Sequence, residues 1–326
     1  MFNTSKTMDL AYNVSENLKG YLDKIEKLRT EILLYPISPK TELRLKWDGM
    51  MEKVLWSLSL TENTLSKANV VSLLSSMSKG KSKLTNFEKD VINQKKAFSY
   101  IKENWLVSEM PVSMNTIKKL YDLSCRETLG IMSGLTEYSE KRINTVLTYL
   151  QKGKDHPVVQ AGVAQIELIN ITPFDNGNGR VARLLSYLFL YKNGYDVREL
   201  ISFEEFFRRD IITFKRMMEL SKIQGNLTLW LEYFAFCVMH SLEKTAEIIK
   251  NQKFQENLPS SFWKLNSRQR QIIEVLENPG LSITNKEVQK IHNISQITAS
   301  RDLSNLVALG MLLSHGKGRS VYYTKV

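Results

Sequence analysis

Apolar residues recur at helical spacing along most of the chain, which predicts a mainly α-helical protein. The pattern continues to about residue 252, and a further short helix is expected to end near residues 79–81. The longer predicted helices cover residues 10–34, 40–60, 86–105, 114–124, 139–151, 157–170, 180–193, 203–222 and 227–252. Glycine and proline, which interrupt helices, number only 15 and 7 in 326 residues. We therefore expect helices packed on helices.

The pattern changes after the polar residues 251–261, which contain Pro259 and are the expected interdomain linker. A helix over 267–277 precedes an Asn-Pro-Gly turn, and Thr284 with Glu287 forms a capping box before a second helix. Asn293 suits a tight turn.

Ser295 is expected to cap a third helix that runs to about Leu309, with Gly310 as its C-cap. Residues 311–314 and 320–323 predict two strands joined by a basic turn. Three helices followed by a basic hairpin resemble a winged helix-turn-helix.

Charge and cysteine content narrow the class of protein. The formal net charge is +11, and residues 258–326 hold nine Lys or Arg against four Asp or Glu, which gives +5. This balance favours an acidic partner such as DNA, although solubility is an alternative. The two cysteines, Cys125 and Cys237, are interpreted as reduced core thiols in a cytoplasmic protein. No apolar run approaches the length of a bilayer span, so no membrane contact is expected.

The run from Thr172 to Arg183 carries the strongest chemical signal. Gly177, Asn178 and Gly179 could turn backbone N–H groups toward an anion, and a helix begins directly after them. Arg180 and Arg183, one helical turn apart, supply cations with a geometry suited to phosphate. The run therefore predicts a phosphate-binding loop. The alternative is a tight interhelical turn whose arginines pair with core carboxylates.

The same run resembles the signature of the Fic (Fido) family, H-P-F-x-D/E-G-N-G-R-x-x-R. The resemblance implies a Fic-type helical domain and transfer of AMP from ATP, with Mg²⁺, to a protein hydroxyl. It also implies that Phe174 and the Gly-Asn-Gly loop contact the nucleotide. By position, Arg180 would hold the middle phosphates and Arg183 the terminal one.

Two residues depart from that signature. Thr172 stands in place of the family histidine, which acts as general base, and a threonine hydroxyl does not titrate near neutral pH. Asn176 stands at the acidic metal-binding place and offers a neutral carbonyl instead of a carboxylate. We therefore expect weak or absent AMP transfer.

The resemblance extends to an inhibitory helix, S/T-x-x-x-E-G/N, whose glutamate pairs with the second arginine. Glu62 and Asn63 match its end, while Leu58 occupies the Ser/Thr place. Glu62 is therefore predicted to lie within salt-bridge reach of Arg183; a solvated helix end is the alternative. Residues 1–85 are thus expected to form an N-terminal helical region with this segment, residues 86–252 a Fic-like core, and residues 262–326 the winged helix.

In a winged helix the second helix of the helix-turn-helix enters the major groove, and the wing contacts the DNA backbone or minor groove. Gln296, Thr298 and Arg301 are the predicted groove residues, and Lys317 with Arg319 the predicted wing tip. A winged helix used for protein contacts, including a homodimer, is the alternative.

Three functions follow. The first is a Fic-fold nucleotide or phosphate sensor, or a scaffold, coupled to DNA and catalytically impaired. The second is an active protein adenylyltransferase that modifies an unidentified protein. The third is a structural regulator whose pocket is filled by Glu62.

Overall fold

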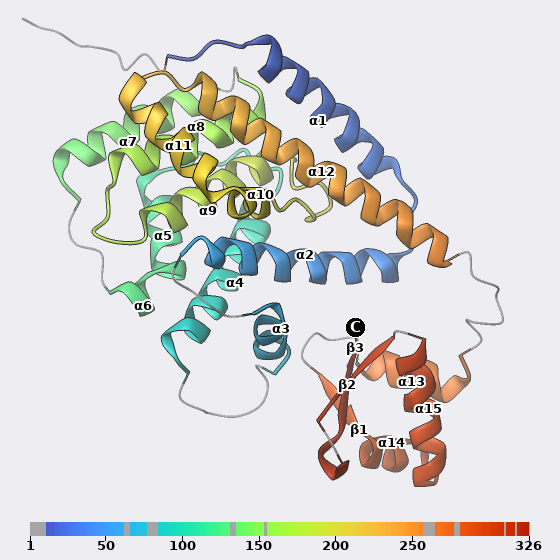
Figure 1. The fold of residues 1–326 in the computed structure, drawn as a ribbon. Helices are drawn as coiled ribbons and strands as arrows, with labels where there is room; N and C mark the ends of the chain where they lie inside the picture. The colour runs from blue at the N-terminus through green and yellow to red at the C-terminus, as the bar shows by residue number, and fades with distance from the viewer. Residues whose placement is uncertain are drawn as a thin grey trace, which may run out of the picture. The chain divides into compact units, whose positions relative to one another are not determined.

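The computed structural model describes residues 11–61, 66–76, 84–130, 135–152, 155–256, 265–276, 281–309, 311–316 and 318–325. The chain divides into two compact units, one of residues 1–67 and 84–250 and the other of residues 68–83 and 251–326 (Figure 1). None of the described helices is both long and apolar enough to cross a membrane. Both cysteines are buried free thiols, as expected.

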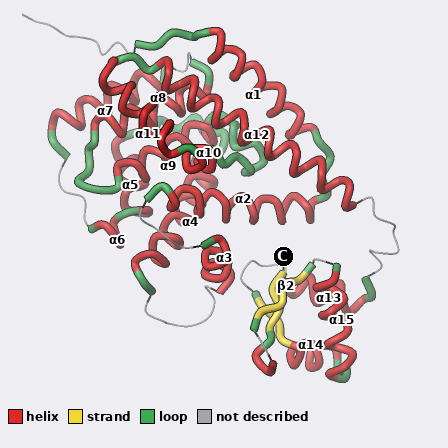
Figure 2. The backbone as a smooth tube through the Cα atoms, viewed as in Figure 1, coloured by secondary structure: helices red, strands yellow, loops and turns green. Residues whose placement is uncertain are grey.

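The described part of the first unit is almost entirely helical (Figure 2). Its helices are α1 (Glu16–Leu34), α2 (Pro39–Ser59), α4 (Asn86–Trp105), α5 (Met114–Ser124), α6 (Arg126–Leu129), α7 (Glu137–Leu150), α8 (Pro157–Ile171), α9 (Asn178–Lys192), α10 (Glu204–Arg209), α11 (Ile211–Gln224) and α12 (Thr228–Glu256). The mainly helical prediction is confirmed. The region expected as one helix over 203–222 is instead two, because Asp210 leaves helical geometry and its side chain caps α11 by accepting the Thr213 N–H at 3.0 Å.

Helices α8 and α9 form the centre of this unit, since every residue from Arg180 to Tyr191 is buried and most of α8 is buried as well. A glycine allows α12 to approach them closely. A Cβ at Gly162 would lie 2.9 Å from a Leu231 methyl carbon, and the Gly162 carbonyl accepts the Trp230 indole N–H at 2.8 Å. The loop that joins α8 to α9 is therefore held by a rigid core.

The second unit contains α13 (Ser267–Val275), β1 (Ser282–Thr284), α14 (Asn285–His292), α15 (Gln296–Ala308), β2 (Leu312–His315), the short 3₁₀ turn Gly318–Ser320 and β3 (Tyr322–Lys325). Helix α3 (Lys67–Ser76) begins where the chain passes from the first unit to the second. The strands form an antiparallel sheet in the order β1-β3-β2, with Tyr323 opposite both Ile283 and Ser314. This is the predicted winged-helix architecture.

The core of the winged helix is apolar, and Val288, Leu303 and Leu306 within it are fully buried. The capping box of Thr284 and Glu287 is present, and Ser295 caps α15. Asn293 makes the predicted turn with a φ of 50°.

Three details of the winged helix were predicted wrongly. Strand β1 was missed because three residues are too few for an alternating pattern to stand out. The two wing strands begin one or two residues later than expected. The C-cap of α15 is Leu309, whose N–H reaches the Asn305 carbonyl at 2.9 Å, whereas Gly310 lies outside the described residues.

Candidate phosphate loop and winged-helix surface

The loop between α8 and α9 is closed by its own side chains. The Asn178 side-chain oxygen accepts the Phe174 N–H at 2.9 Å, and its amide donates to the Phe174 carbonyl at 2.6 Å. The Phe174 ring is buried and lies 4.6 Å, centre to centre, from the ring of Tyr121 on α5. Asn178 and Phe174, both predicted to contact a nucleotide, therefore hold the shape of the loop.

The two glycines of the loop lie close to neighbouring side chains, and Gly177 is the more tightly packed. Gly177 has a φ of +83°, and a Cβ there would lie only 2.7 Å from the Cys125 sulfur. A Cβ at Gly179 would lie 3.2 Å from the Arg183 guanidinium. The backbone at both glycines thus lies against side chains of the same unit.

Arg180 is buried and paired within the core. Its guanidinium donates to both carboxylate oxygens of Asp90 on α4, at 2.7 and 3.1 Å, and to the Ser124 carbonyl at 2.7 Å. Only 4% of Arg180 is exposed. Asp90 also accepts the Thr128 hydroxyl of α6 at 2.6 Å. Two-point pairing of this kind is the geometry by which arginine binds carboxylate or phosphate.

Arg183 is equally enclosed. Its Nε donates to the Glu204 carboxylate on α10 at 2.9 Å, and a terminal nitrogen donates to the Ser57 carbonyl on α2 at 2.9 Å. The Glu204 side chain has no exposed surface and also accepts the Tyr187 hydroxyl at 3.3 Å. Burial raises the pKa of the Glu204 carboxyl, and the facing Arg183 opposes that shift. The interpretation of the loop as an interhelical turn with paired arginines thus describes their contacts correctly.

Thr172 and Asn176 lie on the outside of the loop, and both are exposed. Thr172 adopts left-handed backbone angles, φ 45° and ψ 60°, which are unfavourable for a β-branched residue. Among the described residues, no group of three or more His, Cys, Asp or Glu could hold a metal ion. A neutral Asn176 and the two buried ion pairs weaken the fit of these residues to ATP with Mg²⁺.

The predicted inhibitory contact falls outside the described residues, because Glu62 belongs to residues 62–65. The described carboxylate partner of Arg183 is Glu204.

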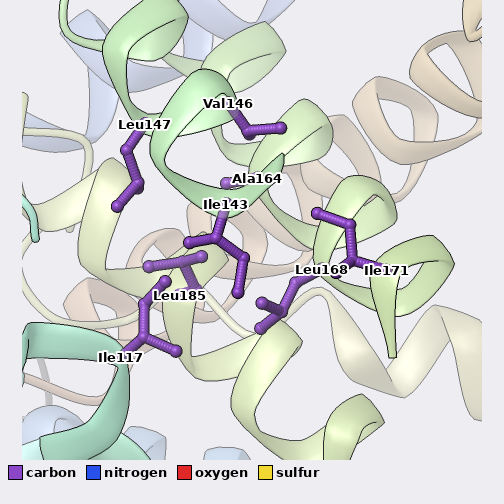
Figure 3. Close-up of a pocket in the computed structure, with 8 residues that line it drawn as sticks. All are labelled: Ile117, Ile143, Val146, Leu147, Ala164, Leu168, Ile171 and Leu185. Atoms are coloured by element: carbon purple, nitrogen blue, oxygen red, sulfur yellow. The ribbon is translucent and has the colours of Figure 1, made fainter. Parts of the chain in front are cut away.

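An apolar pocket lies between α5, α7, α8 and α9 (Figure 3). All eight lining side chains are aliphatic, namely Ile117, Ile143, Val146, Leu147, Ala164, Leu168, Ile171 and Leu185. It offers no donor or charge to a phosphate, so it is not a nucleotide site.

In the winged helix, one face of α15 is exposed and the other is core. Gln296 and Arg301 are exposed, whereas Ala299 and Leu303 are fully buried. Thr298 is half-buried, and its hydroxyl lies 3.0 Å from that of the cap residue Ser295. Of the predicted wing tip, Lys317 and the Arg319 side chain lie outside the described residues.

The fold and the loop between α8 and α9 define the class of protein. It is a Fic-type helical domain followed in sequence by a winged helix. The sequence profile of the Fic/DOC family matches residues 113–190. This match and the loop support a Fic/Fido family protein.

Individual relatives are distant. The chain is 24% identical over 216 residues to a protein named protein adenylyltransferase Fic from Drosophila ananassae, and 26% identical over 175 residues to the protein of that name from Drosophila mojavensis. These matches cover 59% and 47% of this chain, but only 42% and 34% of the relatives. The chain thus spans less than half the length of those proteins.

Two solved structures share the fold. A Fic family protein from Desulfovibrio desulfuricans G20 matches with a TM-score of 0.63 at 15% identity, over 97% of each chain. Fic-1 from C. elegans matches with a TM-score of 0.58 at 20% identity, over 69% of this chain and 70% of that one.

Sequence reasoning missed the two carboxylates that pair with the arginines. Asp90 lies on the face of α4 that also carries Ala97 and Ile101, and a charged residue on an otherwise apolar face was the available signal. Glu204 had a weaker signal, because it stands in a short acidic and aromatic run with no clear periodicity. Neither residue could be matched to its arginine without the fold.

Proposed function

We propose that this protein is a DNA-binding regulator whose Fic-fold unit does not transfer AMP. The observation that carries the absence of AMP transfer is the burial of Arg180 and Arg183 in ion pairs with Asp90 and Glu204. The Fic-fold unit then has a structural role, and the loop stabilises the core of that unit.

The charge balance of the loop supports this proposal. Two arginines and two carboxylates sum to zero, so the loop offers a polyphosphate no net attraction from these four groups. A phosphate that took the guanidinium positions now held by Asp90 or Glu204 would leave a buried carboxylate unpaired. Breaking a buried pair in this way typically costs about 3–5 kcal/mol. Phosphate binding at those positions is therefore unfavourable while both pairs persist.

The position of Thr172 supports it further. In the family that the sequence resembles, the residue at this place removes a proton, and general-base help typically contributes about 10²–10⁴ in rate. A threonine hydroxyl cannot accept a proton at neutral pH. Loss of the base affects proton removal, and enclosure of the arginines affects phosphate binding. The two effects therefore reinforce each other.

DNA binding is supported by the exposed face of α15. The acidic residue of this helix, Asp302, points inward, where it accepts hydrogen bonds from Asn266, Arg268 and Gln269. The outward face carries Arg301 and hydrogen-bonding side chains, and α14 adds the exposed lysines 286 and 290. The exposed face of α15 carries a cation and no carboxylate, although α14 exposes Glu287 beside its lysines. Such a face on α15 favours contact with phosphates.

An active protein adenylyltransferase is the second candidate, and the names of the curated Drosophila relatives favour it. It would use ATP with Mg²⁺ and modify another protein. In that case the nucleotide phosphates would compete with Asp90 and Glu204 for the arginines. Filling of the pocket by Glu62 remains a prediction.

Two measurements on the full chain test the proposal. We expect no AMP-modified protein after incubation with ATP labelled at the α-phosphate and Mg²⁺, with the Drosophila ananassae adenylyltransferase as a positive control. We expect mixed-sequence duplex DNA to be retarded in a gel at low salt. AMP labelling would favour the enzyme instead, and failure to bind any duplex would end the DNA half of the proposal.

A further inference from the structure

Helix α15 exposes a large apolar side chain at its second residue. Ile297 is 73% exposed, although the other apolar residues of the same turn and the next, Ala299 and Leu303, are fully buried. Exposure follows from helical geometry, because residues 296, 297, 300, 301 and 304 share the face opposite the core. Neither helix formation nor core packing requires an isoleucine at this position, since β-branched residues are weak helix formers.

The surroundings of Ile297 are polar. Gln296 and Arg301 are exposed, and within the described part of the chain neither side chain has a hydrogen-bond or salt-bridge partner. The Ser300 hydroxyl, by contrast, accepts the Asn285 amide at 2.8 Å, and the same amide donates to the Gln296 carbonyl at 3.2 Å. This contact ties α15 to the start of α14. Gln296, Ile297 and Arg301 are therefore held on a fixed helix with their side chains available.

One apolar group among hydrogen-bonding and cationic groups matches the major groove of DNA. Thymine alone among the four bases presents a methyl group there, while purines present acceptors and donors that Arg and Gln recognise. Sites that bind proteins typically present a larger apolar patch than one isoleucine, whereas single apolar side chains are common on surfaces. The polar surroundings of Ile297 therefore favour DNA over a protein partner.

We infer that Ile297 contacts the C5 methyl group of a thymine in the major groove and so selects thymine at one position of the bound site. This inference rests on the proposed DNA binding. The inference adds Ile297 to the groove residues of α15, which were predicted from hydrogen-bonding and charged side chains alone. Thr298 stays a predicted groove residue, although it is half-buried and its hydroxyl lies 3.0 Å from that of the cap residue Ser295.

The test uses the full chain and a preferred duplex obtained by selection from a random library. Each thymine is replaced in turn by deoxyuridine, which lacks the C5 methyl group and keeps base pairing. We expect one replacement, and not the others, to weaken binding by about fourfold, the effect of burying one methyl-sized group. Ile297→Ala should abolish this difference between thymine and deoxyuridine, and Ile297→Val should retain part of it.

Ile291→Ala is the matched control, because Ile291 is also exposed, at 53%, but lies on α14. It should leave the thymine preference unchanged. If the duplex binds but no deoxyuridine replacement matters, or if Ile297→Ala keeps the difference, the inference is overturned while DNA binding stands. If no duplex binds at low salt, the proposed function itself fails.

Discussion

Arg183 on α9 and Glu204 on α10 form an ion pair in the interior of the first unit, with Nε and the carboxylate oxygen 2.9 Å apart and both side chains no more than 5% exposed. The pair joins α9, which begins directly after the candidate phosphate loop, to α10, which follows it in the chain. Ser57 of α2 contributes its carbonyl to the same guanidinium. Three elements thus converge on a residue that the sequence suggests for phosphate binding.

Removing one partner of this pair should destabilise the protein strongly. We expect Glu204→Gln to lower the free energy of unfolding by about 3–5 kcal/mol, because Arg183 would keep its charge without a buried counter-ion. Urea denaturation measures this change. The double variant Arg183→Met with Glu204→Leu should recover much of the loss.

A surface pair provides the control. Arg44 and Asp48 are 3.9 Å apart, with side chains 42% and 53% exposed, so Arg44→Gln should cost less than about 1 kcal/mol. If Glu204→Gln costs no more than Arg44→Gln, the buried pair does not form in solution.

Gly177 should not tolerate a side chain. Gly177→Ala combines a left-handed backbone with a Cβ 2.7 Å from the Cys125 sulfur, and we expect a loss of roughly 2–4 kcal/mol in thermal or urea unfolding. Gly225→Ala is the matched control, because Gly225 also has a left-handed backbone, φ 61° and ψ 15°, but nothing lies within 4 Å of its Cβ position. Adding Cys125→Ala should relieve part of the Gly177→Ala defect. Equal losses at the two glycines would contradict the close packing.

The stability of the first unit should depend on pH through Lys53. This lysine is fully buried, and its ammonium donates to the Tyr191 hydroxyl at 2.8 Å and the Glu199 carbonyl at 2.7 Å. Burial lowers its pKa from 10.5 to about 8, partly opposed by Glu199. Between these values the unfolded chain binds more protons, so stability rises with pH.

We expect the free energy of unfolding of the wild type, relative to Lys53→Met, to increase by about 2 kcal/mol between about pH 7.5 and about pH 9.5. Using the variant as reference removes the titration of other groups. Urea denaturation across this range provides the measurement, and a flat difference would show that Lys53 is not buried as described.

Restoring the family residues should not by itself restore catalysis. We expect Thr172→His with Asn176→Asp to show no AMP labelling, because Arg180 and Arg183 remain paired with Asp90 and Glu204. The double variant should still fold, since both positions are exposed and histidine accepts left-handed backbone more readily than threonine. Circular dichroism checks folding. Labelling by this variant would show that the arginines open to nucleotide.

The basic wing should contribute to DNA affinity without selecting sequence. Lys317→Ala with Arg319→Ala should weaken binding to all duplexes about equally and reduce the slope of log affinity against log salt by up to roughly two. Titration at several salt concentrations measures the slope. Lys19→Ala with Lys27→Ala on α1 removes the same charge elsewhere and should leave the slope nearly unchanged. Equal effects of the two pairs would indicate a general charge effect.

Local signals in the sequence were sufficient to predict the helical fold, the winged helix and the loop. Capping depends on residues within one turn, so Thr284 with Glu287 and Ser295 could be assigned directly. The Gly-Asn-Gly-Arg run likewise marked the start of α9. These features depend on contacts between near neighbours in the chain, which the sequence displays.

Only the tertiary structure decided what the arginines bind. Arg180 pairs with a residue 90 positions away and Arg183 with one 21 positions away, across separate helices. An arginine fork accepts phosphate and carboxylate with the same geometry, so its own sequence cannot distinguish the two. The difference lies in whether packing brings a carboxylate to the guanidinium, and here the packing of α4 and α10 against α9 supplies one to each.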